Sequence, residues 1–362
     1  MVKQLCRSLI LAVLTAAIWS RSLANDQMHS QYQQQKPLQE VRNLGIDYLK
    51  AGKYQAAIDT FQQAIQLNPN FYEPYFLMGL AYASLGKHKD AIAAYQQAIL
   101  LKNDDADVYL ALTQSWDQLQ DFQQTLKSIR EVVRLRPNSA DVHNGLSYAY
   151  ANLGQYEDAL NAAKDAVRLD PNNAEAYINM SFSYIRLDRN QEAIDAARQA
   201  ARLKPDMPLA YINIGYAQNQ LGRYQDALDS GQQALGLKEE PREAGVTYYI
   251  IGYAHDKLFR RQKAVEAYKQ SVTSYKQAPR LAPDDYYYMG NSYFQLEQNE
   301  AAIEAFTKAI NLRPNFAQAH FSFGLLYASL GNKKDALEEY SILKSLDPGR
   351  AEKLFKMIYS KR

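Results

Sequence analysis

The chain has 362 residues, with 41 basic residues against 39 acidic ones and a formal net charge of +2. This near balance argues against nucleic acid as the main partner, because nucleic-acid-binding surfaces carry a clear excess of Lys and Arg. The single cysteine, Cys6, stands close to the N-terminus, so the rest of the chain offers no disulfide, thiolate metal site or cysteine nucleophile.

Residues 1–24 have the composition of an export signal. Lys3 and Arg7 precede an apolar run over residues 9–18, and small residues close the segment. The pattern is typical of a secretory signal peptide, with an uncleaved N-terminal anchor as the alternative, since a membrane span needs ~20 apolar residues. We therefore expect an exported protein, periplasmic or membrane-associated outside the cytoplasm. Residues 25–37, rich in Gln and Ser, are expected to form a flexible spacer.

The remainder of the chain repeats with a period of 34 residues. Prolines recur at this interval or a multiple of it, apart from one interval that runs seven residues over, and they are Pro69, Pro137, Pro171, Pro205, Pro314 and Pro348. Small residues recur in phase with them, for example Gly45, Gly79, Gly215, Gly252, Gly290 and Gly324. Apolar residues fall 3, 4 and 7 positions apart, which is a helical spacing. A period of this size predicts small helical units that stack in a row and bury their apolar faces on one another.

These residues closely resemble the tetratricopeptide repeat. The resemblance covers residues 38–350 and divides them into nine tandem units, at 38–71, 72–105, 106–139, 140–173, 174–207, 208–241, 245–278, 283–316 and 317–350. It implies an all-α solenoid, a right-handed superhelix of antiparallel helix pairs in which the first helix of each pair lines a concave groove. A protein of the exported bacterial type is expected.

Two insertions interrupt the period. Three residues, 242–244, precede the seventh unit, and four more, 279–282, precede the eighth. We interpret them as a local change in superhelix geometry, with a possible hinge over 242–282. A longer loop with unchanged stacking is the alternative.

The last residues, 351–362, place Leu354, Phe355 and Ile358 on one helical face. We expect a helix that caps the final unit, because an exposed terminal repeat would leave its apolar side in water. A membrane-surface or partner-binding helix is the alternative.

The resemblance also implies which residues face the groove. An aromatic stripe and a set of amides fall on such positions in the fourth to seventh units, and they are Tyr148, Phe182, Tyr216 and Tyr253 with Asn144, Asn179 and Asn213. Amides can pair with the backbone of an extended peptide, and rings can hold its apolar side chains. The hypothesis is that this surface binds an extended or helical polypeptide segment. The alternative is that the rings only pack against the neighbouring helix.

Charged residues on the same helices have weaker implications. The second position of several units is acidic, at Glu73, Asp107, Asp141, Glu175 and Asp284. We interpret these acids as partners of the helix dipole, with attraction of a basic segment as the alternative. The family's clamp for C-terminal carboxylates is not expected, because Arg42, Lys50, Arg186 and Lys257 are scattered over distant units.

The sequence contains no motif for catalysis, metal binding or cofactor binding, and no segment is left over for a catalytic domain. The expected function is therefore that of a non-enzymatic scaffold or adaptor, without cofactor, that binds protein in its groove and supports assembly of an envelope or membrane-associated complex. Two alternatives stay open: an accessory subunit that positions a catalytic partner, and a solenoid that binds glycan or another polymer.

Overall fold

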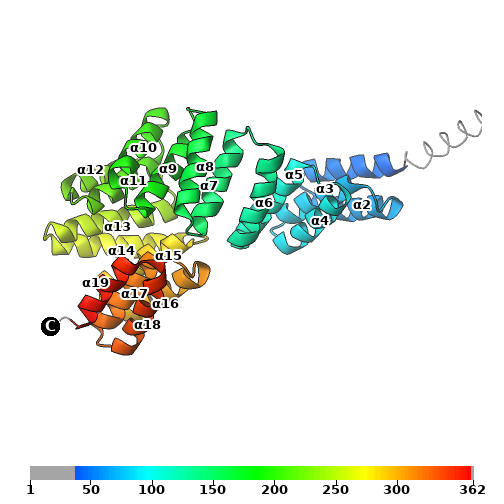
Figure 1. Cartoon of the computed structure of the whole chain (residues 1–362). Coiled ribbons are helices and arrows are strands. Elements are labelled where there is room, and N and C mark those ends of the chain that lie inside the picture. Colours follow the sequence, from blue (N-terminus) through cyan, green and yellow to red (C-terminus); the bar gives the residue numbers. More distant parts are fainter. Residues whose placement is uncertain (1–36, 360–362) are drawn as a thin grey trace, which may run out of the picture. The chain divides into compact units, whose positions relative to one another are not determined.

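The computed structural model describes residues 37–359 (Figure 1). Those residues are helical throughout, with short turns and no strand. The predicted signal segment 1–24, with Cys6, lies outside the described residues, and so does the spacer 25–37 except for its last residue, which already begins a helix.

The chain divides into two compact units whose boundary falls between Leu119 and Gln120. The N-terminal unit contains a helix over residues 37–50, followed by α2 (Tyr54–Leu67), α3 (Tyr72–Ser84), α4 (His88–Leu101) and α5 (Ala106–Gln118). The boundary therefore lies between the two helices of the repeat expected at 106–139.

The C-terminal unit begins with α6 (Phe122–Leu135), α7 (Ala140–Asn152), α8 (Tyr156–Leu169), α9 (Ala174–Arg186), α10 (Asn190–Leu203), α11 (Pro208–Gln220) and α12 (Tyr224–Leu235). It continues with α13 (Pro241–Lys257), α14 (Arg261–Gln277), α15 (Pro283–Gln295), α16 (Asn299–Leu312), α17 (Ala317–Ser329), α18 (Lys333–Leu346) and α19 (Pro348–Tyr359). Within this unit, helices that follow one another in the chain pack together, as expected for a solenoid of helix pairs.

Small residues in the first helix of a pair allow its second helix to approach closely. At Gly79 of α3, a Cβ atom would lie 2.4 Å from Cε1 of the fully buried Tyr95 on α4. A side chain at this position would push the ring out of the core, so the periodic glycine and the periodic aromatic are two halves of one contact.

The turn inside a pair requires a left-handed residue. Glycine fills it at Gly52, Gly86, Gly154, Gly222 and Gly331, with φ between 71° and 76°. Four other turns use Gln120, Asp188, Phe259 and Glu297, with φ between 58° and 60°. Polar residues tolerate this conformation better than a bulky aromatic residue, so Phe259 stands apart from the other three.

The first insertion lengthens a helix rather than a loop. Residues 242–244 lie in the opening turn of α13, which runs for 17 residues where α11 has 13. The Glu243 carboxylate accepts a hydrogen bond from the backbone N–H of Glu240 at 3.1 Å, and this contact fixes the helix start. The longer-loop interpretation is thus wrong for 242–244. The second insertion, 279–282, forms the connection between α14 and α15.

The C-terminal helix α19 packs on α17 and α18. Leu354 is fully buried and Ile358 is 6% exposed, so these two residues cover the last pair as a cap. Phe355 does not share that buried face. It is 41% exposed, and its ring centroid lies 5.1 Å from that of Tyr340.

One buried histidine joins α17 to α18. His320 is 2% exposed, with Nδ1 2.6 Å from a Glu339 carboxylate oxygen and Nε2 2.9 Å from the Pro314 carbonyl oxygen. Burial lowers the pKa of His320, but the hydrogen bonds to Glu339 and Pro314 outweigh it, so this pKa lies above its ordinary value. Because both ring nitrogens face acceptors, the charged imidazolium is the form that satisfies the site.

Candidate functional site

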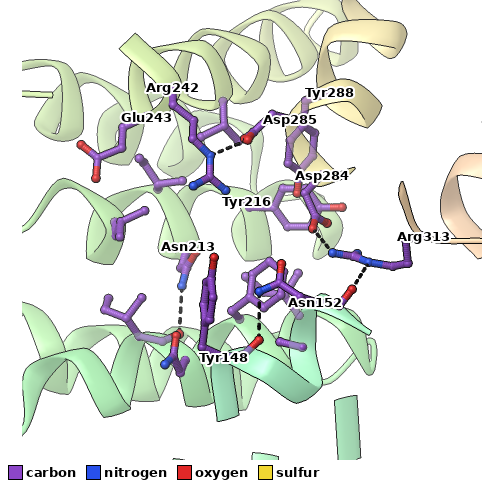
Figure 2. A pocket seen from close by; sticks show the side chains of 18 residues that line it. Tyr148, Asn152, Asn213, Tyr216, Arg242, Glu243, Asp284, Asp285, Tyr288 and Arg313 are labelled. Atoms are coloured by element: carbon purple, nitrogen blue, oxygen red, sulfur yellow. Dashed lines mark hydrogen bonds and ion pairs between the residues drawn. The ribbon is translucent and has the colours of Figure 1, made fainter. Parts of the chain in front are cut away.

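A cavity of about 290 Å³ lies inside the C-terminal unit (Figure 2). Its walls come from the first helices of five successive pairs, α7, α9, α11, α13 and α15, together with Arg313 at the end of α16. Because every first helix presents the same face inward, residues that are 34 or more positions apart in sequence meet on one surface.

Five of the seven residues predicted from the sequence line this cavity, and they are Tyr148, Asn179, Phe182, Asn213 and Tyr216. Asn144 and Tyr253 are not among the lining residues. The cavity thus gathers most of the predicted surface from α7, α9 and α11, and α13 contributes other residues than Tyr253.

The aromatic residues of the stripe differ in how much of each ring packs against other side chains. Tyr148 is 42% exposed and stands at the cavity (Figure 2). Phe182 meets Tyr156 edge-on at 6.4 Å between ring centroids, and Tyr216 meets Tyr288 edge-on at 5.9 Å. Tyr253 packs beside Tyr249 within its own helix. The packing interpretation therefore describes Tyr253, whereas much of the Tyr148 surface is exposed at the cavity.

The amides tie neighbouring first helices together. The Asn179 side-chain amide donates to Asn144 Oδ1 at 2.7 Å, and the Asn213 amide donates to the Ile178 carbonyl at 3.4 Å. Asn144 thus supports the site from outside the cavity. These bonds hold α7, α9 and α11 in register and fix the amides at the cavity wall.

The opposite wall carries a buried charge network. Asp284 accepts a hydrogen bond from Arg313 Nη2 at 2.7 Å and lies 3.2 Å from Arg186 Nη2. The side chains of Arg186 and Arg313 are 1% and 2% exposed. Burial raises the pKa of Asp284, but the charges of Arg313 and Arg186 outweigh it and hold that pKa below its usual value. Arg186 also stacks over Phe316, with 4.8 Å from its guanidinium carbon to the ring centroid.

A second ion pair lies beside this network. Arg242 binds the Asp285 carboxylate (Figure 2), and the Arg242 side chain is 50% exposed. Burial raises the pKa of Asp285 to about 6 even though the Arg242 charge opposes the shift. Arg242 belongs to the inserted residues 242–244, so the insertion supplies Arg242 and Glu243 to the lining of the cavity.

Hydrogen bonds between distant repeats close the solenoid on one side of the cavity. Arg313 Nε donates to the Asn152 carbonyl at 2.9 Å and its Nη1 to the Tyr156 hydroxyl at 3.1 Å. Asn315 donates to the Leu153 carbonyl at 3.0 Å, across 162 residues of sequence. These two carbonyls lie at the C-terminal end of α7, where unpaired acceptors attract a cation. We call this set of contacts the closure.

Two further contacts lie along the closure. An ion pair joins Arg350 to Asp188 at 3.4 Å, and the Gln120 amide donates to the Leu281 carbonyl at 2.9 Å. Leu281 belongs to the second insertion, 279–282. The groove that the sequence predicted is therefore bounded by later repeats of the same unit.

Comparison with known proteins identifies the repeats. Sequence profiles described as "Tetratricopeptide repeat" match residues 42–108, 140–173, 183–243 and 246–278, and one described as "TPR repeat" matches 290–331. The chain belongs to the tetratricopeptide repeat family. Repeats of this family bind other proteins, so the chain is a protein-interaction scaffold. No curated protein matches this sequence significantly.

Solved structures similar to this tetratricopeptide repeat protein include three at low identity. A crystal structure of MamA is 20% identical, covering 44% of this chain and 94% of its own, with a TM-score of 0.43. A MamA fragment from Desulfovibrio magneticus RS-1 is 22% identical, covering 47% and 96%, with a TM-score of 0.45. The APC/C hetero-tetramer Cut9-Hcn1 is 16% identical, covering 88% and 76%, with a TM-score of 0.49.

Sequence reasoning missed the charged wall of this tetratricopeptide repeat protein. Arg313 stands one residue before a periodic proline, a position where Arg136 and Lys204 also occur, so it resembles an ordinary cation at a helix end. Asp284 lies in the first turn of α15, as the dipole interpretation expects, but it is also the centre of a buried ion network that the sequence does not predict. The position of Arg242 inside an insertion was the one available signal. Among residues 37–359, no group of three or more potential ligands is arranged to hold a metal ion.

Proposed function

We propose that the C-terminal unit binds a polypeptide segment of a partner protein at the cavity between α7, α9, α11, α13 and α15. The supporting observation is the convergence of Tyr148, Phe182 and Tyr216, from three successive repeats, on one recess. The volume of about 290 Å³ stands at the lower end of the range for ligand pockets. The recess therefore suits one or two side chains of a segment that runs across its mouth.

The residues that line the cavity indicate which kind of polypeptide segment would bind there. Aromatic and aliphatic residues form one side, and they favour an apolar or aromatic side chain at the centre. The half-exposed Arg242 and the amide of Asn179 stand among the lining residues, where they can pair with polar groups of the segment backbone. An apolar anchor flanked by hydrogen-bonding backbone is the expected ligand.

The proposed setting is an envelope or membrane-associated assembly outside the cytoplasm. The support is the pattern of basic and apolar residues in segment 1–24. Over residues 37–359, no helix has both the length and the apolar character needed to traverse a bilayer. Cell fractionation with N-terminal sequencing of the purified protein tests this setting, and recovery of the intact chain from the cytosol contradicts it.

Substitution of the stripe tests the binding proposal. The full chain with Tyr148, Phe182 and Tyr216 replaced together by Ala should lose the partner proteins that co-purify with the wild type from native cells. Tyr148→Ala alone should weaken their capture with little change in stability, because this ring is 42% exposed. Leu100→Ala, at a residue that is 76% exposed in the N-terminal unit, serves as the control. Equal recovery of partners by the wild type and the triple variant would refute the proposal.

The same preparation separates the other functions. A specific enzymatic activity that co-purifies with the chain indicates an accessory subunit that positions a catalyst. Binding of soluble polysaccharide without any protein partner indicates a glycan-binding solenoid, and it contradicts the proposed polypeptide ligand.

A further inference from the structure

Four polar residues line one end of the cavity. Tyr216 on α11 and Tyr288 on α15 meet edge-on, with 5.9 Å between their ring centroids. Asp284 lies one helical turn before Tyr288, and Arg313 joins the Asp284 carboxylate to the backbone of Asn152. Figure 2 shows Tyr216, Asp284 and Tyr288 gathered near Arg313. We call Asn152, Tyr216, Asp284 and Tyr288 the polar end.

Three groups at the polar end have no hydrogen-bond partner in the protein. Among residues 37–359, the hydroxyls of Tyr216 and Tyr288 make no hydrogen bond. The Asn152 side-chain nitrogen donates to the Tyr148 carbonyl at 3.0 Å, and its Oδ1 receives no donor from the same residues. Tyr288 is 6% exposed and Asn152 is 7% exposed. A buried polar group without a partner destabilises a fold, so packing alone would favour Phe over Tyr at position 288.

These groups provide donors and acceptors in one place. Burial raises the pKa of Tyr216 and of Tyr288, so both hydroxyls stay protonated at neutral pH. Each hydroxyl can donate one hydrogen bond and accept another, whereas Asn152 Oδ1 can only accept. The polar end is therefore complementary to a ligand group that both donates and accepts.

Positive and negative groups offset one another around the cavity. Its lining includes two cations and three acids, with Arg186 bound to one of the acids from behind, and the lining members are Arg242 and Arg313 with Glu243, Asp284 and Asp285. Each nitrogen of Arg313 already donates, to Asn152, Tyr156 or Asp284. Beyond Tyr216, Arg350 and Asp188 pair with each other at 3.4 Å. An ionised ligand group would lose its hydration without gaining a charged partner, so a neutral group is favoured.

We propose that the polar end receives the hydroxyl of a tyrosine side chain, so that the anchor of the bound polypeptide segment is tyrosine and not phenylalanine. This inference rests on the proposed function of the cavity. The ring would pack on aliphatic lining residues such as Ile178 and Ile212, while its hydroxyl donates to Asn152 Oδ1 and accepts from Tyr216 or Tyr288. An indole N–H only donates, Phe and Leu do neither, and Glu brings a charge.

Three blocked pentapeptides test the proposal. Each carries Tyr, Phe or Glu between two pairs of glycines, and its affinity for the full chain is measured by titration. Wild type should bind the Tyr peptide about tenfold more tightly than the Phe peptide, because Phe leaves the buried polar groups unpaired. It should bind the Glu peptide more weakly than the Tyr peptide. Tyr288→Phe should weaken binding of the Tyr peptide about tenfold and leave binding of the Phe peptide unchanged.

Tyr268→Phe is the matched control. Its hydroxyl is also buried without a partner, but Tyr268 lies outside the cavity lining, so the change should alter no peptide affinity. Tyr288→Phe should keep or raise the melting temperature, since it removes an unpaired buried hydroxyl. A lower melting temperature would overturn the proposal, because the hydroxyl would then serve the fold.

The peptide affinities decide between the remaining outcomes. Equal affinity of wild type for the Tyr and Phe peptides, tighter binding of the Glu peptide, or an unchanged preference in Tyr288→Phe would overturn the proposal. So would failure of all three peptides to bind at about 10 mM. Partner capture by the variant with Tyr148, Phe182 and Tyr216 replaced by Ala decides the proposed function separately. Loss of capture there, without a preference for the Tyr peptide here, contradicts only the tyrosine anchor.

Discussion

Removal of the Arg313 charge should open the closure of the C-terminal unit. In Arg313→Met the chain loses the bonds to the Asn152 carbonyl, the Tyr156 hydroxyl and Asp284, while a side chain of similar bulk remains. Arg313 is 2% exposed, so its removal takes a buried donor from the Asn152 carbonyl and leaves Asp284 with Arg186 as its one remaining ion-pair partner within residues 37–359. Breaking a buried ion pair from one side costs about 3–5 kcal/mol. We therefore expect the free energy of unfolding of the C-terminal unit to fall by that amount.

Urea unfolding combined with hydrogen exchange measures this effect. Amide exchange should accelerate at the end of α7 and in α15, on the two sides of the closure, while residues 37–119 of the N-terminal unit exchange as before. In a chain that already carries Asp284→Asn, Arg313→Met should lower the free energy of unfolding by about 1–3 kcal/mol less than it does in the wild type, because the two residues share one interaction. Arg168→Met is the matched control. Arg168 is 69% exposed and pairs with Asp165, so its replacement should lower the free energy of unfolding by less than about 1 kcal/mol. The reasoning would be refuted if Arg313→Met lowered the free energy of unfolding no more than the control does, or if amide exchange around α7 and α15 did not change.

Two further predictions concern packing and protonation. Gly79→Ala should destabilise the N-terminal unit by about 1–3 kcal/mol, because the added Cβ meets the Tyr95 ring. Gly145→Ala should be neutral or stabilising by up to about 1 kcal/mol, since its nearest neighbour would lie at 3.5 Å, and thermal unfolding of both variants decides the point. The pKa of His320 is raised in the folded state, so its contribution to stability is complete below the ordinary value of 6.5 and is lost as pH rises through the folded pKa. Urea midpoints of wild type and His320→Gln should therefore differ most at acidic pH, and a difference that grows toward alkaline pH would contradict the charged pairing with Glu339.

Contacts that repeat with the 34-residue period could be predicted from the sequence. Gly79 and Tyr95 recur in phase with the prolines because each helix pair must repeat the same close contact with its neighbour. The same phase places Tyr148, Phe182 and Tyr216 on one face, and the structure gathers them on one cavity.

Features that depend on how far the superhelix turns could not be predicted in this way. The contact between Arg313 and the Asn152 carbonyl spans 161 residues. Small rotations from one pair to the next accumulate over this distance, and no local pattern records their sum. For this reason Arg186 and Asp284, which are far apart in sequence, were interpreted separately and not as partners.

The closure has a consequence for how this protein can change in evolution. In an open solenoid a repeat can be gained or lost at modest cost, because each one touches only its neighbours. Between Asn152 and Arg313 a helix pair cannot be gained or lost in this way, because the change would move Arg313 and Asn315 away from the end of α7 and break their hydrogen bonds to it. The number of pairs in this stretch is then fixed by geometry, much as strand number is fixed in a closed barrel. We expect natural length variation to fall outside it.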